Sequence, residues 1–253
     1  MRAVAACLKQ ALQGRGFFLA FLGAALVVLF AAFESFLGAF RSEQLLPYGY
    51  HHSLILSALS SQPMALALPI LCALPYTAAF LDDVKSGFIK AYLPRTTVTR
   101  YITSQALACA ISGGLALFMG ILVAYGLTAL LLLPLEAMRD YLLEPPGYFL
   151  QLLETLVMFF ASGAFWALVG LTFATLTNSR YMAYASPFVL FYLLVILYER
   201  YFDKLYILYP REWLNPSGRW VFGRIGVAVL LLELSALMAL LFAWAAKRRL
   251  RQI

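Results

Sequence analysis

Few side chains in this sequence have the type and spacing that catalysis requires. His51 and His52 are the only histidines, and adjacent residues point about 100° apart on a helix, which does not suit joint metal ligation. We expect them to be polar residues at a membrane boundary. The sequence contains no GxxxxGK(S/T), HExxH or GxSxG motif. We therefore expect no catalytic residue, no metal site and no cofactor bound by this chain.

The three cysteines also lack the spacing of a metal site. They are Cys7, Cys72 and Cys109, and each lies in or beside an apolar segment. Packing is therefore their expected role.

Three carboxylates fall within apolar segments: Glu34, Glu154 and Glu233. The first two lie close enough to segment ends to reach headgroup water. Glu233 lies near the middle of the last segment, where a charge costs about 2.5–3.5 kcal/mol on insertion scales. We expect it to face the bundle interior, to be protonated or to be paired. It is either a polar point on a substrate path or hinge, or a hydrogen-bonded packing residue.

A basic polar stretch, Asp82–Gln105, separates two of the apolar segments. Asp82 and Asp83 are suited to begin a helix, because carboxylates cap and complement helix N-termini. The pattern predicts a short amphipathic helix over 84–93, ended by Pro94, and a further helix capped by Thr96 or Thr97. Rigid flanking helices would position this loop for function. The plain alternative is an ordinary basic loop with one helical turn.

The composition places these features in a membrane protein. Of the 253 residues, 63% are hydrophobic and 12% charged, against about 25% charged in soluble domains. The apolar runs are continuous, which indicates helices rather than a barrel. The net charge of +7 is concentrated at the ends of the runs and does not indicate nucleic-acid binding.

We predict an all-α membrane protein with a single domain over residues 1–253 and six transmembrane helices. An amphipathic elbow helix over 1–16 would lie along the inner membrane surface and precede the first span. The six expected spans are 17–37, 53–81, 103–133, 148–176, 182–198 and 220–246.

Two of these spans carry features that affect their shape. The second contains Pro63, Pro69 and Pro75, each of which removes a backbone donor, so we expect it to be kinked, tilted or partly broken. The third carries small residues at steps of four, which let another helix approach closely. They are Ser112, Ala116, Gly120 and Ala124. This ladder forms either an intramolecular contact or a dimer seam. Separately, Pro69 of the second span and Gly120 of the third are candidate residues of a hinge or of the translocation path.

The distribution of Lys and Arg predicts the topology. The larger share of the 19 basic residues lies in 1–16, in the loop over 82–100, in the short loop after the fourth span and at the C-terminus. The positive-inside rule therefore places both termini in the cytoplasm of a multi-pass cell-membrane protein. The outer segment over 199–219 is rich in aromatic residues, and we expect short helices at the outer surface rather than a free domain.

The loop resembles that of the type-2 ABC exporter permeases. The resemblance rests on Phe80–Asp83, Ser86–Lys90, Leu93–Arg95 and Tyr101, together with the elbow, the six spans and the long outer segment. The element Pro94–Arg95–Thr96 lacks the small residue that usually precedes the arginine in this family. The resemblance covers almost the whole chain, although each motif alone is weakly specific.

The resemblance implies that two permease subunits pair and that each contacts a separate ATP-binding cassette subunit, which binds ATP and Mg. The short helix after the second span would be the coupling helix. The implied docking residues are Asp82, Asp83, Gly87, Phe88, Lys90 and Arg95. The pairing would be homo- or heterodimeric, in contact with membrane lipid.

Two further functions compete with this one. The first is an ATP-independent membrane scaffold or assembly protein. The second is an intramembrane enzyme, which is disfavoured because no nucleophile–base pair or metal pair is visible in the sequence.

Overall fold

The computed structural model describes residues 2–41, 44–92, 96–137, 147–202, 204–216, 220 and 222–251. These residues form a helical bundle, and within them the only β pairing is an isolated bridge between Leu46 and Glu136. The predicted all-α class is therefore confirmed. The four longest helices are α8 (Val98–Leu132), α9 (Tyr148–Thr177), α10 (Arg180–Arg200) and α11 (Gly223–Leu250).

The shorter helices lie mainly in the first part of the chain. They are α1 (Arg2–Gln13), α2 (Arg15–Ala31), α3 (Phe33–Arg41), α4 (Tyr50–Leu59), α5 (Gln62–Leu71), α6 (Ala79–Lys85) and α7 (Phe88–Tyr92). Two 3-10 turns, η2 (Leu133–Leu135) and η3 (Tyr206–Leu208), follow α8 and α10.

Among the described residues, four helices are long and apolar enough to cross a membrane: α8 with its 3-10 extension, α9, α10 and α11. Two bent pairs raise the number to as many as six. One joins α1 to α2 at 58°, and the other joins α4 to α5 at 65°. The structure therefore contains four to six candidate spans, and the predicted six are the upper end of that range.

The expected spans correspond closely to the long helices and less closely to the short ones. The fourth was expected over 148–176 and is α9, over 148–177. The first expected span is interrupted at Ala32, between α2 and α3. The second is broken, as its prolines predict: Pro63 lies in the first turn of α5, Pro69 lies inside α5, and Pro75 lies in the turns over 72–78.

The segment over 72–78 is non-helical and largely buried. Irregular backbone at membrane depth is tolerated where protein surrounds it, because lipid offers no hydrogen-bonding partner. Cys72, Ala73 and Thr77 are each at most 1% exposed, which fits this requirement. The break therefore separates α4 and α5 from α6.

Helix α8 is the centre of the bundle and packs along α9, α2 and α1. Its contacts with α9 and α2 leave no room for side chains at two glycines. A Cβ at Gly113 would lie 2.5 Å from the Ala167 Cβ of α9, and a Cβ at Gly120 would lie 2.5 Å from the Ala24 Cβ of α2. Ser112, Ala116 and Ala124 of the same ladder are fully buried. The ladder is therefore an intramolecular contact, and the alternative of a dimer seam on this face is wrong.

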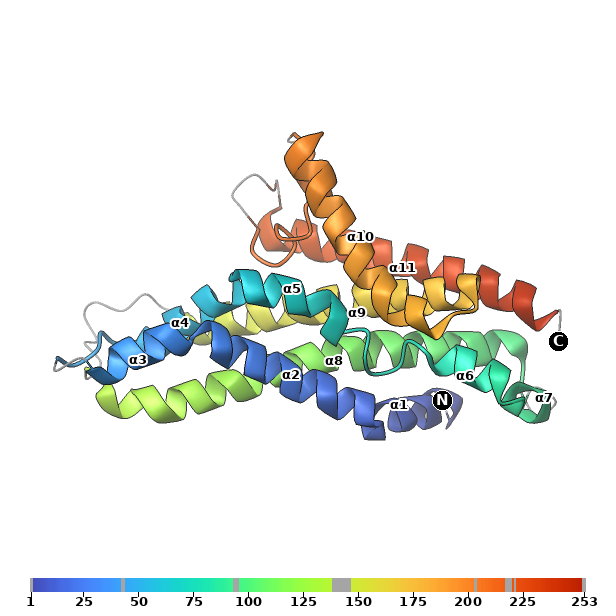
Figure 1. Ribbon diagram of the computed structural model, residues 1–253, viewed down its shortest axis with the longest axis horizontal. Coiled ribbons are helices and arrows are strands. Elements are labelled where there is room, and N and C mark those ends of the chain that lie inside the picture. Colours follow the sequence, from blue (N-terminus) through green and yellow to red (C-terminus); the bar gives the residue numbers. More distant parts are fainter. Residues whose placement is uncertain are drawn as a thin grey trace.

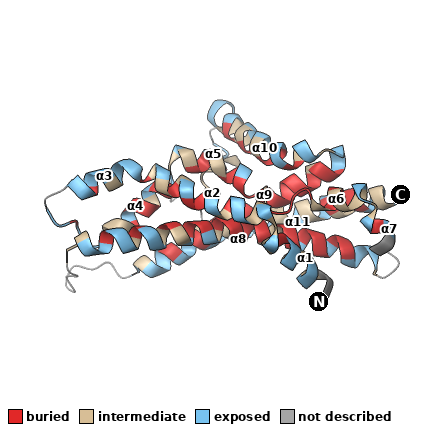
Figure 2. Ribbon diagram, turned by 60° about the horizontal axis from the view of Figure 1, so that its bottom comes forward, coloured by how far each residue is buried: buried red, intermediate tan, exposed pale blue. Residues whose placement is uncertain are grey.

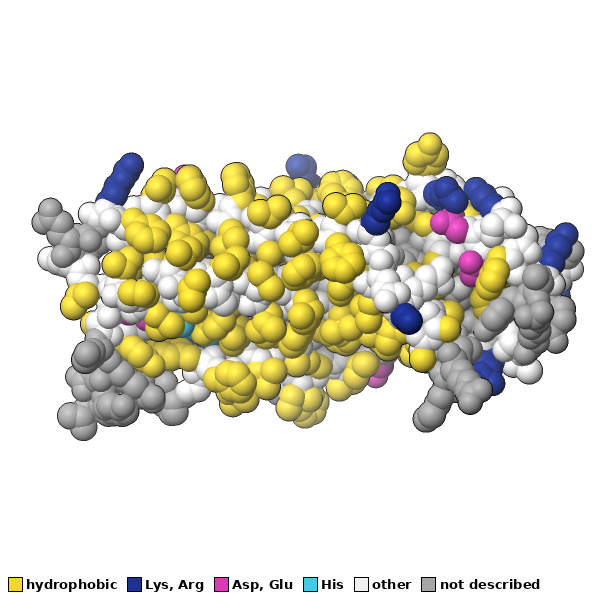
Figure 3. All heavy atoms as spheres, turned by 90° about the horizontal axis from the view of Figure 1, so that it is seen from below, with side chains coloured by type: hydrophobic (Ala, Val, Ile, Leu, Met, Phe, Trp, Pro, Cys, Tyr) yellow, Lys and Arg dark blue, Asp and Glu magenta, His cyan; other side chains and the backbone are white. Residues whose placement is uncertain are grey.

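Both termini lie at the same end of the molecule as α6, α7 and the turn between α9 and α10 (Figure 1). This grouping is the one that the basic residues predict for a single side of a membrane. In the view of Figure 3, hydrophobic side chains cover most of the face, and charged side chains gather mainly toward the α6–α7 end.

Helices α10 and α11 are the least enclosed of the long helices, and the exposed residues along α10 are visible in Figure 2. In their most apolar stretches, 28% of α10 and 22% of α11 is buried, compared with 72% of α9. Helix α10 leans away from the rest of the bundle in Figure 1. The segment after it packs back onto the bundle through Trp213, which is 2% exposed and stacks 6.0 Å from Trp166.

The contact between α8 and α2 makes a prediction about stability. Gly120→Ala places a methyl group against Ala24 and the Phe21 carbonyl, and we expect overpacking to cost about 1–3 kcal/mol. Gly126→Ala is the matched control, because a Cβ there meets nothing within 4 Å. Thermal unfolding in detergent should show a lower melting temperature for the first variant and an unchanged or higher one for the second. Equal effects would contradict close packing at Gly120.

Candidate coupling site

The loop after the second span forms two short helices rather than one. We expected a helix over 84–93 that began at Asp82 and Asp83. Instead, both residues lie inside α6, which begins at Ala79, and the chain turns at Gly87 before α7 begins at Phe88. Gly87 has a φ of +74°, a left-handed conformation that glycine adopts without steric cost. The expectation was wrong because α6 already begins at Ala79, runs through the two carboxylates and stops at this turn.

Asp83 ties α6 to α8. Its Oδ2 accepts a hydrogen bond of 2.6 Å from the Tyr101 hydroxyl and one of 2.8 Å from Gln105 Nε2. Gln105 Nε2 also donates to the Tyr101 oxygen at 3.1 Å. Tyr101 and Gln105 are four residues apart and so lie on the same face of α8. Burial raises the pKa of the Asp83 carboxyl, and the hydrogen bond from Tyr101 offsets part of that shift.

Asp82 ties α6 to the start of α10. Its Oδ1 lies 2.6 Å from Nε of Arg180, the first residue of α10. Both side chains are about half exposed, at 58% for Arg180 and 44% for Asp82. An exposed pair of this kind contributes little stability, although it joins the start of α10 to α6.

Both carboxylates that we assigned to partner docking are thus bonded within the chain. Neither Tyr101, Gln105 nor Arg180 was among the predicted site residues. The i, i+4 spacing of Tyr101 and Gln105, downstream of two adjacent aspartates, was the available signal, but it does not identify the acceptor without the fold.

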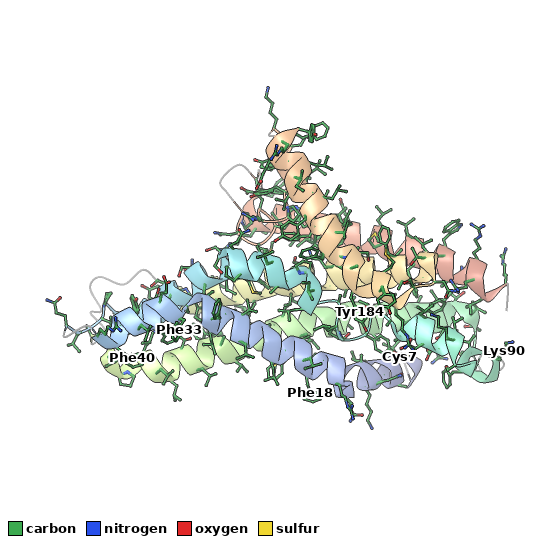
Figure 4. All side chains as sticks on the ribbon, viewed as in Figure 1. Cys7, Phe18, Phe33, Phe40, Lys90 and Tyr184 are labelled. Atoms are coloured by element: carbon green, nitrogen blue, oxygen red, sulfur yellow. The ribbon has the colours of Figure 1, made fainter. Side chains whose placement is uncertain are left out.

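Helix α7 presents the remaining predicted residues. Ile89 is 2% exposed and anchors α7 to the bundle, whereas Phe88 is 49% exposed. Lys90 is exposed and points away from the bundle at its end (Figure 4). Arg95 lies outside the described residues, as does the Leu93–Pro94 element. The described part of this surface is therefore an aromatic ring and a cation on a short, anchored helix.

The elbow region reaches the same end of the molecule. The Tyr76 hydroxyl donates a hydrogen bond of 3.3 Å to Oε1 of Gln10 in α1. A cavity of about 340 Å³ lies between α1 and α6, and Asp82, Asp83 and Tyr184 line it. Helices α1, α6, α8 and α10 therefore meet around the two carboxylates.

The candidate path and hinge residues lie on three different helices. Pro69 and Gly120 are buried, Pro69 inside α5 and Gly120 against α2. Glu233 lies on the exposed face of α11, and no hydrogen bond or ion pair joins it to another described residue. The expectation that it faces the interior of this chain is wrong. Pairing with a group outside the chain remains a prediction.

The opposite end of the molecule carries an acidic residue that the sequence did not single out. The two carboxylate oxygens of Glu136 accept hydrogen bonds from the backbone N–H groups of Gly49, at 3.1 Å, and His51, at 2.7 Å. Nδ1 of His51 also lies 2.8 Å from Glu136 Oε1. Glu136 therefore caps the start of α4 from the end of α8. No group of His, Cys, Asp and Glu in the described part of the chain is arranged to hold a metal ion.

No family model matches the chain, and no curated protein matches it.

The raised pKa of Asp83 predicts a pH-dependent stability. A carboxyl whose pKa is raised in the folded state stabilises the fold fully below its ordinary value of 3.8, and this contribution is lost as the pH rises through the folded pKa. Asp83→Asn removes the ionisation and keeps an oxygen acceptor for Tyr101 and Gln105. We expect its melting temperature in detergent to exceed that of the wild type at pH 7, with a difference that shrinks toward pH 4.

Asp83→Ala is the control for the hydrogen bonds, because it should melt below the wild type throughout this range. If the difference in melting temperature between Asp83→Asn and the wild type does not change with pH, ionisation of Asp83 does not account for the stability difference.

Proposed function

We propose that this chain is the membrane-spanning subunit of an ATP-driven exporter and that it works as a dimer coupled to a separate nucleotide-binding subunit. The observation that carries the proposal is α7, a short helix with a half-exposed Phe88 and an exposed Lys90, anchored at one end of an apolar bundle. A partner that presses on such a helix moves the helices that flank it.

The connections of α7 support this mechanism. One side continues into α6, whose Asp83 is bonded to α8 and whose Asp82 is paired with α10. A displacement of α7 is therefore transmitted to three helices at once. The breaks over 72–78 and between α4 and α5 offer defined points at which the second span can bend.

In this proposal, ATP and Mg are bound by the partner subunit, and closure of the ATPase dimer is the source of the movement. Phe88, Lys90 and Arg95 contact the ATPase. Gly87 sets the angle of α7, and Asp82 and Asp83 transmit the movement rather than dock the partner. Both termini and α7 face the cytoplasm of the cell membrane.

Glu233 supports the dimer. A carboxylate on the outside of a span costs about 2.5–3.5 kcal/mol if it faces lipid, and a second permease subunit would remove it from lipid. It lies on α11, the least enclosed of the long helices. The seam is accordingly proposed on the exposed face of α11, and not on the ladder of α8.

The docking surface is tested by copurification from the native membrane. An ATPase subunit should copurify with the wild-type chain, and Phe88→Asp should release it, because a carboxylate replaces the apolar side chain at the centre of the contact. Tyr201→Asp is the matched control, an exposed aromatic residue on the segment after α10 that is 72% exposed. It should retain the ATPase.

If no ATPase is recovered with the wild type, or if Phe88→Asp still retains the ATPase, the proposal that the chain is an exporter subunit is refuted. An ATP-independent scaffold would then be the better description.

The dimer is tested by cysteine crosslinking in membranes. In a chain whose native cysteines are replaced by serine, Glu233→Cys should give a covalent dimer on oxidation. Leu122→Cys, exposed on α8, should not. A crosslink at Leu122 without one at Glu233 would place the seam on α8 and contradict the proposed interface.

A further inference from the structure

A second cavity lies away from the α6–α7 end, beside the break between α4 and α5. Its volume is about 320 Å³, within the range of small-molecule sites. Polar side chains reach it from four parts of the chain: Ser61 and Gln62 at the break, Thr155 of α9, Arg211 and Glu212 of the outer segment, and Arg224 of α11. None of these residues belongs to the proposed coupling site.

Arg211 is the main charge of this cavity. One guanidinium nitrogen, Nη2, donates a hydrogen bond of 2.8 Å to the neutral Oε1 of Gln62. Its Nε is buried and has no acceptor among the described residues. No ion pair joins Arg211 to a carboxylate in the described part of the chain. A guanidinium held only by neutral groups retains its attraction for an anion, and its planar fork suits phosphate and carboxylate.

The start of α5 adds to the positive potential. Ser61 is the N-cap residue, but its hydroxyl donates to the Ala58 carbonyl and makes no capping bond. Pro63, the second residue of α5, has no N–H, so the N–H groups of Gln62 and Met64 remain without a side-chain acceptor at the end of the helix that carries the positive dipole. Ser61 and Gln62 both line the cavity, so this end of α5 and Arg211 act on the same space.

Two other charged side chains line the cavity, one basic and one acidic. Arg224 is paired with Glu154 of α9, and Glu212 lines the cavity as the one further carboxylate among its described residues. The apolar part of the lining comes from Leu56, Leu59, Ala65, Phe159 and Leu214, and Ser60, Gln151, Tyr209 and Asn215 add further polar groups. The space thus combines two arginines and neutral polar groups with apolar side chains, which is the pattern required by an amphipathic ligand.

We propose that this cavity binds a phosphate-bearing amphipath, with the phosphate on Arg211 and the N-terminus of α5, and the apolar part against Ala65 and Phe159. A membrane phospholipid and a free phosphate share the same anionic group. The apolar lining favours the lipid. The inference rests on the cavity alone and does not depend on whether the chain is an exporter.

The test uses the purified full-length protein in detergent, with melting temperature as the readout of binding. The probes are dihexanoyl phosphatidic acid, dihexanoylglycerol, which lacks the phosphate, and inorganic phosphate. We expect phosphatidic acid to raise the melting temperature and the other two to leave it unchanged. Arg211→Gln should weaken the apparent affinity for phosphatidic acid by about tenfold or more, because a charged hydrogen bond is lost.

Two further variants complete the experiment. Ala65→Leu fills the apolar side without changing charge and should abolish the shift, which keeps the test decisive if Arg211→Gln does not fold. Arg200→Gln removes an exposed arginine at the end of α10 and should bind like the wild type. An equal shift with inorganic phosphate or with dihexanoylglycerol would overturn the proposal, as would wild-type affinity in Arg211→Gln or Ala65→Leu.

Discussion

The structure depends on the close approach of α8 to its neighbours. Gly113 and Gly120 bring the backbones of α9 and α2 to distances at which a Cβ could not fit. In a membrane, where lipid is as apolar as the side chains, association of helices relies on such contacts rather than on exclusion of water. Because α8 carries both contacts, it fixes α2 on one side and α9 on the other, and α10 and α11 are then added through α9.

The second span differs from the continuous helix α8 because it is broken at two places. It bends by 65° between α4 and α5 and loses helical structure over 72–78 before α6. Its two ends are held by polar bonds to α8, through Glu136 at one end and Asp83 at the other. A segment that is bonded at both ends and broken between them can change shape without leaving the bundle, and this property is the physical basis of the proposed coupling.

The charged side chains fall into two groups. Some are bonded to other groups of this chain, and others have no oppositely charged partner among the described residues. Asp82, Asp83 and Glu136 are bonded to groups on neighbouring helices, so they determine the packing of this chain. Glu233 on the face of α11 and Arg211 in the cavity beside α5 have no oppositely charged partner among the described residues. Unneutralised groups in apolar surroundings are costly. For this reason, the proposed subunit contact and the proposed ligand site are centred on these two residues.

The sequence by itself determined the class of protein, the long helices and the broken second span. Continuous apolar runs can only be helical in lipid, and prolines at 63, 69 and 75 cannot all continue one helix. The tertiary structure alone decided which groups meet. Asp83 with Tyr101, Asp82 with Arg180 and Glu136 with His51 are pairs separated by 18 to 98 positions, and no local pattern encodes them. The same holds for the orientation of Glu233, because the exposed face of α11 is set by the neighbours on its other side and not by its own nearly uniform hydrophobicity.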